Sequence, residues 1–188
     1  QNYNKWELDY LADYIVNTHN NYVRKYLPEL TTYASKVAQV HDAQHPELIQ
    51  IQKLVAEINN ELTEHLAQEE NVLFSYIKKI VEARKGNLPL LKQEKDFAGL
   101  INELEKDHDL VGRAFDQIRA LSKDYAIPSD ACASYKLLYK MIQAKKDIKG
   151  YQIDHYTVIS INGTLKIGCH NIDMKSVKKV GNQLLKMS

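Results

Sequence analysis

The chain has 188 residues, of which 44% are hydrophobic and 26% charged, and its basic and acidic side chains leave a formal net charge of +1. This length suits one domain with a small appendage, and the apolar share is enough for a real core. The nearly balanced charge argues against a nucleic-acid-binding stripe and against a membrane-surface patch. The apolar runs are too short to span a membrane, so neither nucleic acid nor a membrane is an expected partner.

Prolines and glycines punctuate the first 150 residues and predict four helices. Pro28 lies inside the first helix, where we expect a kink or a break. Pro46 stands at the start of the second, a position that suits proline because no helical hydrogen bond is lost there. The predicted helices span about residues 8–40, 46–84, 90–121 and 130–148.

Apolar residues recur in alternating steps of three and four along the second and third predicted helices. This rhythm is typical of the buried seam of an antiparallel helix bundle, and we therefore predict an all-α four-helix bundle over residues 1–149. The seam of the second helix comprises Leu48, Ile51, Val55, Ile58, Leu62, Val72 and Tyr76, and that of the third Phe97, Ile101, Leu104, Val111, Phe115 and Ile118.

Residues 150–188 differ from the rest of the chain in their amino-acid pattern. Two short β-prone runs flank the pair Asn162-Gly163, which is a strong signal for a β-hairpin. Asp173 then stands where it can cap a last amphipathic helix. We therefore predict that residues 150–188 form a divergent tail of strand, turn, strand and helix.

The two cysteines, Cys132 and Cys169, are far apart in the sequence and form no C-x-x-C pair. A disulfide framework is therefore not expected, and a reducing cytoplasm is the predicted compartment. The chain opens with Gln1 and without a basic-then-apolar leader. Because glutamine is not a natural start residue, we expect that the natural chain begins earlier, with a targeting segment or an upstream domain as candidates for the missing part.

Polar side chains interrupt both predicted seams. The three-four rhythm leads from Leu62 to His65 and Glu69 on the second helix, and from Leu104 to His108 on the third. A buried carboxylate without a partner is costly, and a metal ion bound by all three side chains removes that cost. Two histidines and one carboxylate suit non-haem Fe(II), and facing helices are where bundles build such sites.

Simpler interpretations of these residues stay open. A buried histidine such as His108 is more often a hydrogen-bonded core residue than a metal ligand. His65 and Glu69 would form a local pair on the helix surface if the seam were rotated by one position. Glu70 follows Glu69, which also allows a solvated acidic face. The coincidence of three polar residues with their seams favours metal binding over these alternatives.

Several segments resemble the di-iron proteins for repair of iron centres. They are Asp13–His19, Leu27–Leu30, Lys36–His41, His45–Leu48, Glu61–Glu70 and Glu105–Asp109. The resemblance covers roughly residues 5–145 and implies a hemerythrin-like four-helix bundle with two bridged irons. It also implies a role in restoring iron–sulfur clusters after nitrosative or oxidative damage, with iron–sulfur proteins as clients. Many members carry a small cysteine-bearing domain upstream, which this sequence does not contain.

Carried over residue by residue, His65, Glu69 and His108 match ligand positions of the family. The first helix is ambiguous, because members carry a His pair after Asn-Thr where this chain has His19-Asn20. His19 is the better ligand chemically, whereas counting back from the following Leu-Pro-Glu-Leu motif favours Asn20. Both residues lie on acceptable apolar seams, and we take His19 as the fourth predicted metal ligand.

The fourth helix departs from the family pattern, in which it ends with His and Glu four residues apart. Alignment of this region puts Tyr151 and His155 at those positions. Both side chains can bind iron, but Gly150 and the β-prone run after it argue that the helix ends too early. We therefore do not predict them as ligands, and a site with one metal or none is a serious alternative to two irons.

Three further histidines receive structural interpretations. His41 and His45 resemble a family motif at the loop between the first two helices, and we interpret them as loop-capping and hydrogen-bonding residues. His170 is interpreted as a surface residue of the tail.

The leading functional hypothesis is a non-haem iron protein that donates iron or reacts with nitric oxide, rather than a classical enzyme. No Gly-rich phosphate loop and no Ser/His/Asp constellation is visible. The alternative is a divergent structural or interaction module, and an O2- or NO-sensing domain ranks last because no output domain is visible. An incomplete bundle would expose its apolar seam, which favours a homodimer or docking of the tail.

Overall fold

The computed structural model describes residues 6–86, 97–147, 159–161, 164–167 and 170–173. Its helices, of which the two labelled η are π-helices, are α1 (Leu8–Tyr14), η2 (Ile15–Asn20), α2 (Asn21–His41), α3 (Glu47–Gln68), η3 (Glu69–Phe74), α4 (Ser75–Lys85), α5 (Phe97–Leu121) and α6 (Ala133–Asp147). Helices thus occupy the four predicted helical regions, and the all-α class of this part is confirmed. No helix in the described ranges has both the length and the apolarity to cross a membrane.

The helix from α1 to α2 passes Pro28 without a break, so of the kink or break expected there the break is wrong. Pro28 lies on the exposed face of α2. Water can replace a missing backbone hydrogen bond on that face, so the helix tolerates the proline. The departure from regular α-helix comes earlier, in the π-helix η2.

Contacts along the backbone divide the chain into two compact units. One contains α1, η2, η3, α4, the start of α5 and the strands. The other contains α2, α6, most of α3 and most of α5. The predicted domain boundary at residue 149 lies outside the described residues and stays a prediction.

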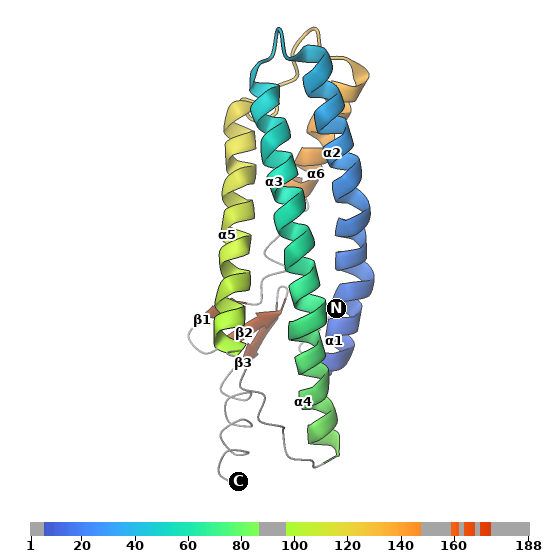
Figure 1. Ribbon diagram of the computed structural model, residues 1–188, viewed down its shortest axis with the longest axis vertical. Helices are drawn as coiled ribbons and strands as arrows, with labels where there is room; N and C mark the ends of the chain where they lie inside the picture. The colour runs from blue at the N-terminus through green and yellow to red at the C-terminus, as the bar shows by residue number, and fades with distance from the viewer. Residues whose placement is uncertain (1–5, 87–96, 148–158, 162–163, 168–169, 174–188) are drawn as a thin grey trace. The chain divides into compact units, whose positions relative to one another are not determined.

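In the first unit, α1 and α4 lie side by side and enclose a cluster of buried apolar side chains (Figure 1). Lysines of α4 pair with aspartates of α1 at the exposed rim: Lys78 Nζ lies 2.5 Å from Asp13 Oδ1, and Lys85 Nζ lies 2.9 Å from Asp9 Oδ2. Exposed pairs of this kind add little stability, so burial of the apolar cluster holds the unit together. The cluster comprises Leu11, Ala12, Ile15, Leu73, Phe74, Ile77 and Leu104.

In the second unit, α2 and α6 lie side by side (Figure 1). The Tyr26 hydroxyl of α2 donates a hydrogen bond to the backbone carbonyl of Met141 in α6. Gln52 of α3 donates to the Ser35 hydroxyl of α2 over 3.2 Å. The largest fully buried side chains of this unit are Leu30, Leu48, Ile51, Ile58, Ile118, Tyr135, Leu138, Tyr139 and Ile142. This unit has the regular, well-packed helix core that the three-four rhythm predicts.

The seam predicted for the second helix is confirmed at most positions up to Glu69, with Leu62 only half-buried, and is wrong beyond Glu69. Leu73 and Ile77 are buried, at 0% and 3% exposure, whereas Val72 and Tyr76 are only half-buried. The cause is η3, because a π-turn closes with i→i+5 hydrogen bonds and shifts the buried face by about one residue.

Three short strands are described in the tail: β1 (Ile159–Ile161), β2 (Thr164–Ile167) and β3 (His170–Asp173). They pair antiparallel in the order β1-β2-β3, with Ile161 opposite Thr164. The third strand was not predicted, and it occupies the residues just before the expected last helix. That helix, apart from Asp173, lies outside the described residues.

Candidate metal centre

His65 and Glu69 project from the same side of one continuous helix, where α3 passes into η3. Both side chains are 2% exposed, and His65 Nε2 lies 3.4 Å from Glu69 Oε1. This burial rules out the interpretation of these two residues as a solvated surface pair. The protein therefore places an imidazole and a carboxylate together inside its core, which is costly unless a proton or a cation neutralises the carboxylate.

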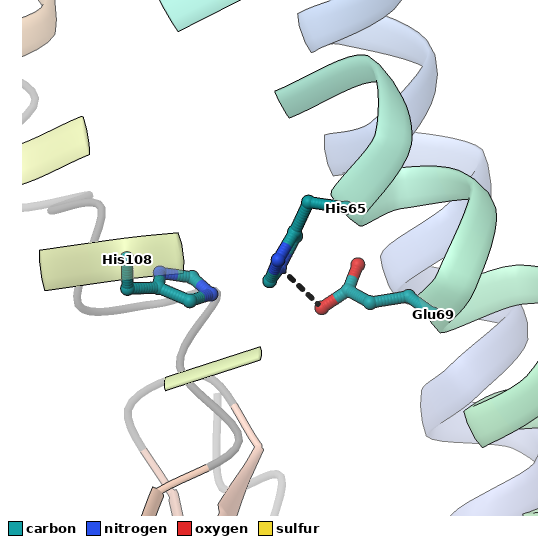
Figure 2. Close-up of side chains that lie close together, drawn as sticks. All are labelled: His65, Glu69 and His108. Atoms are coloured by element: carbon teal, nitrogen blue, oxygen red, sulfur yellow. Dashed lines mark ion pairs between the residues drawn. The ribbon is translucent and has the colours of Figure 1, made fainter. Parts of the chain in front are cut away.

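His108 of α5 completes a group of three. One nitrogen from each histidine and one oxygen of Glu69 all lie within 4.8 Å of one another. Figure 2 shows the His108 ring extending from its own helix towards the His65 ring and the Glu69 carboxylate. We call His65, Glu69 and His108 the donor group. Among the described residues it is the one cluster of His, Cys, Asp and Glu side chains with the spacing of metal ligands.

Asn20, the last residue of η2, contacts the carboxylates of the donor group's helix. Its side chain is fully buried. The Nδ2 amide group donates to Glu70 Oε1 over 2.9 Å and approaches Glu69 Oε2 at 3.4 Å. Asn20 thus offers hydrogen atoms to two adjacent carboxylates that would otherwise repel each other, and it fixes the orientation of Glu69.

The structure does not bring His19 into the donor group. The His19 ring lies against Tyr14, with ring centroids 5.8 Å apart and the planes nearly perpendicular. Of the two alternatives left open by the sequence, Asn20 is the one that faces the carboxylates. The π-helix accounts for the choice, because its wide turn sets which of two consecutive residues points inwards.

The donor set fits a first-row transition metal. Two imidazoles and one carboxylate are the ligands that non-haem iron(II) takes in proteins with open coordination positions. The Oδ1 atom of Asn20 is buried and has no hydrogen-bond partner among the described residues. An unsatisfied buried oxygen next to a buried carboxylate fits a cation, since a cation attracts both groups.

Sequence reasoning missed the two π-helices and the contact of Asn20 with Glu69. A signal was present, because the buried residues His65, Glu69, Leu73 and Ile77 follow one another in steps of four without a step of three. A regular α-helix drifts off its face under such spacing, so the pattern indicates a wider turn. Short π-turns of this kind are frequent at functional sites.

The other predicted residues lie elsewhere. Tyr151 and His155 are outside the described residues, and His170 is in β3. His45 bonds Glu47 Oε1 through Nδ1 and Asp130 Oδ1 through Nε2, each over 3.1 Å. Hydrogen bonding of this loop residue, as predicted, is therefore confirmed.

Helical architecture and donor chemistry together define a helical protein with a His/Glu group that could hold a cation. The family model "Hemerythrin HHE cation binding domain" matches residues 11–147, which include the donor group and Asn20. The chain belongs to this hemerythrin family, as the resemblance predicted.

Several relatives with a stated function show more closely what kind of hemerythrin-type protein the chain is similar to. The chain is 31% identical over 129 residues to the "Iron-sulfur cluster repair protein ScdA" of Staphylococcus haemolyticus, covering 69% of this chain and 54% of that protein. It is 33% identical over 132 residues to a "Probable iron-sulfur cluster repair protein" of Haemophilus influenzae, covering 70% and 54%. It is 30% identical over 140 residues to the "Iron-sulfur cluster repair protein YtfE" of Salmonella typhimurium, covering 73% and 57%. The chain thus spans little more than half the length of these relatives.

Proposed function

We propose that the chain binds non-haem iron at His65, Glu69 and His108. The observation that carries the proposal is the convergence of three donor atoms within 4.8 Å, two of them on side chains only 2% exposed. Calcium and magnesium prefer all-oxygen sites. Two histidines and one carboxylate hold either catalytic zinc or non-haem iron(II), and the relatives named for iron–sulfur cluster repair favour iron.

Each residue of the site has a distinct task in this proposal. The histidines present neutral nitrogen donors, and Glu69 supplies the negative charge that offsets the cation. Asn20 holds Glu69 in place through its amide hydrogens, as outer residues commonly do at metal sites. Bound iron(II) would supply one-electron chemistry and an open position for a small molecule such as nitric oxide. Burial keeps water away from His65, Glu69 and Asn20.

The number of irons is part of the proposal. The resemblance implies two, whereas the donor group by itself accounts for one. A second iron needs further ligands, for which His19 was predicted and for which Tyr151 and His155 lie in the undescribed region. We propose one firmly held iron at the donor group, with a second iron dependent on residues beyond it.

The cellular role follows from the relatives. Three of them are named for iron–sulfur cluster repair, and the match to the hemerythrin family model includes the donor group. We propose that this chain serves the same process in the cytoplasm, with iron–sulfur proteins as clients and iron or an electron as what it delivers. Assembly as a homodimer and a tail of hairpin plus helix complete the proposal.

Iron content after anaerobic purification tests the site. The wild-type chain should hold iron, and His65→Ala should lose it. His19→Ala is the informative companion, because an unchanged content places His19 outside the site, whereas loss of one of two irons makes it a ligand. A wild-type chain with only trace iron, unaltered by His65→Ala, contradicts the proposal.

A reconstitution assay tests the role. A purified iron–sulfur enzyme inactivated with nitric oxide should regain activity faster with the iron-loaded chain than with an equal amount of Fe(II) salt. The His65→Ala chain should match the salt. Equal recovery of enzyme activity in all three samples would contradict the repair role without contradicting the proposal that the chain binds iron.

A further inference from the structure

A second group of polar side chains lies beside the donor group and shares Glu69 with it. We call Asn20, Glu69 and Glu70 the oxygen group. Asn20 is the last residue of η2, and the two glutamates are the first two residues of η3. All three belong to the compact unit that contains both π-helices. The fold of a single unit therefore brings these three side chains together.

The two carboxylate oxygens of Glu69 face different partners. Oε1 lies 3.4 Å from His65 Nε2, whereas Oε2 lies 3.4 Å from Asn20 Nδ2. The same Nδ2 atom lies 2.9 Å from Glu70 Oε1, so one end of the Asn20 amide contacts the carboxylates of both glutamates. A carboxylate has lone pairs on both oxygens. Glu69 can therefore bind one ion through Oε1 and a second ion through Oε2.

The amide oxygen of Asn20 is an independent observation that points to an ion. The Asn20 side chain is fully buried, and its Oδ1 atom has no hydrogen-bond partner among the described residues. A buried carbonyl oxygen without a partner is costly and rare in native proteins. Oδ1 and Nδ2 are bonded to the same carbon and are similar in size, so half a turn about the Cβ–Cγ bond exchanges them. Oδ1 would then point at both carboxylates, an arrangement of three oxygens that only a cation stabilises.

The charges of the oxygen group act in the same direction. Glu69 is 2% exposed and Glu70 is half-buried, so neither carboxylate is fully surrounded by water. Two ionised carboxylates that close together repel each other, and the repulsion grows as water is excluded. Asn20 is neutral, so its amide hydrogens offset the repulsion only in part. A divalent cation between the two carboxylates would offset both charges.

We propose that the oxygen group binds a hard divalent cation of the Mn²⁺ and Mg²⁺ class next to the donor group, with Glu69 shared between the two sites. Carboxylate and carbonyl oxygens suit these cations, whereas imidazole nitrogens favour iron and zinc. The group supplies three oxygens and no nitrogen, and water would complete the coordination on the half-buried side of Glu70. The ion therefore differs in kind from the second iron that the resemblance implies. It does not require iron at the donor group.

The test uses Mn²⁺ as the probe, in a His65→Ala chain whose donor group is disabled. Binding is measured by EPR, because free Mn²⁺ gives an intense spectrum that is lost on binding. Glu70→Gln keeps the size of the side chain and removes its charge. It should weaken Mn²⁺ binding at least about tenfold, because the affinity of an oxygen site depends on the number of charged ligands. Glu64→Gln removes an exposed carboxylate of the same continuous helix and should leave the affinity unchanged.

Asn20→Leu tests the amide oxygen in the same background. Leucine has a similar size but no ligand atom, so the change should weaken Mn²⁺ binding at least about threefold, less than the loss of a charged ligand. Asn21→Leu alters the exposed neighbour and is the control. Equal affinities for Asn20→Leu and Asn21→Leu would contradict the proposal that Asn20 is a ligand.

If His65→Ala does not fold, the wild-type chain loaded first with one equivalent of Zn²⁺ replaces it. Zinc accepts two histidines and a carboxylate and gives no EPR signal, so it fills the donor group without interfering. Absence of Mn²⁺ binding, equal affinities for Glu70→Gln and Glu64→Gln, or coupling of bound Mn²⁺ to imidazole nitrogen in pulsed EPR would overturn the proposal. The iron content of the wild-type chain decides the donor group separately, so failure of one site is distinguishable from failure of the other.

Discussion

His45 and His65 both lie beside carboxylates, yet the two regions that hold them differ in how the polar atoms are satisfied. His45 has a carboxylate on each ring nitrogen, and Asp130, one of the two, is half exposed to water. His65 meets one carboxylate, Glu69, with both side chains 2% exposed, and a second histidine approaches the same point. The ring nitrogens of His45 are satisfied within the protein, whereas the donor group is an arrangement of acceptors that fits a cation.

The comparison of His45 with His65 shows which feature of a buried histidine predicts function. Burial alone does not, because His41 is also buried. What distinguishes the donor group is convergence of several electron-pair donors on one point in the core.

The largest effect is expected in the unit that contains α6. Leu138 is fully buried, whereas its neighbour Leu137 is 39% exposed. Leu138→Ala should lower the free energy of unfolding by about 2–5 kcal/mol, because it removes buried methyl groups and leaves a cavity. Leu137→Ala is the matched control and should change it by less than about 1 kcal/mol. Urea denaturation measures both, and equal losses would mean that α6 is not packed as described.

Iron should stabilise the protein through the donor group. Binding to the native state alone adds about 2.7 kcal/mol when free Fe(II) is a hundredfold above its dissociation constant. Anaerobic thermal melts should therefore shift upwards for the wild type and for His45→Gln, but not for His65→Ala. If iron still raised the melting temperature of His65→Ala, or no longer raised that of His45→Gln, the donor group would not be the iron site.

Asn20 should affect metal affinity without being a ligand in the donor group. Asn20→Ala removes the amide that holds Glu69 and Glu70, and outer-residue losses of this kind cost about tenfold or more in affinity. Asn21→Ala is the control, because Asn21 is exposed. Competition with a chelator measures both affinities. Equal affinities for the two variants would limit Asn20 to a packing role.

The smallest effect is expected from the His45–Asp130 pair. The hydrogen bond with Asp130 raises the pKa of His45 above its ordinary value of 6.5, and the same bond lowers the pKa of Asp130 below 3.8. The His45 contribution is therefore complete below pH 6.5 and is lost as the pH rises through the raised value. An exposed pair of this kind adds little stability, so the expected effect is small.

His45→Gln measures this contribution. The melting temperature of the wild type should exceed that of His45→Gln by more at acidic than at alkaline pH, as long as the pH stays above the range in which Asp130 is protonated. Asp42→Asn, which alters an exposed carboxylate of the same loop, is the control and should show no such difference. A constant gap between wild type and His45→Gln across the range would mean that the ion pair does not form in solution.

Much of this structure could be predicted from the periodic spacing of apolar residues in the sequence. The seam of the second helix identified Leu48, Ile51, Val55 and Ile58 as core residues, and all four are buried. The interruption of the seams by polar side chains identified the donor group, because polar residues at core positions need a specific reason to be there.

Other features escaped prediction for a physical reason. The prediction from apolar steps of three and four residues assumes a regular α-helix. It therefore predicted that Val72 and Tyr76 are buried, whereas the buried residues are Leu73 and Ile77. The choice between His19 and Asn20 depended on the same assumption. Both positions lie in or next to a π-turn, where backbone hydrogen bonding, rather than side-chain type, sets the direction of each residue. Whether His19 binds a metal stays a prediction.

The π-helix η3, Glu69–Phe74, allows one helix to meet two requirements at once. Upstream, His65 and Glu69 must face the site, and downstream, Leu73 and Ile77 must face the apolar cluster. Deleting one residue such as Asn71 would restore an ordinary helix and rotate one half against the other by about a quarter turn. The chain would then keep its ligands or its core in register, but not both. A single deletion in this π-turn would therefore cost the protein either its metal ligands or part of its packing.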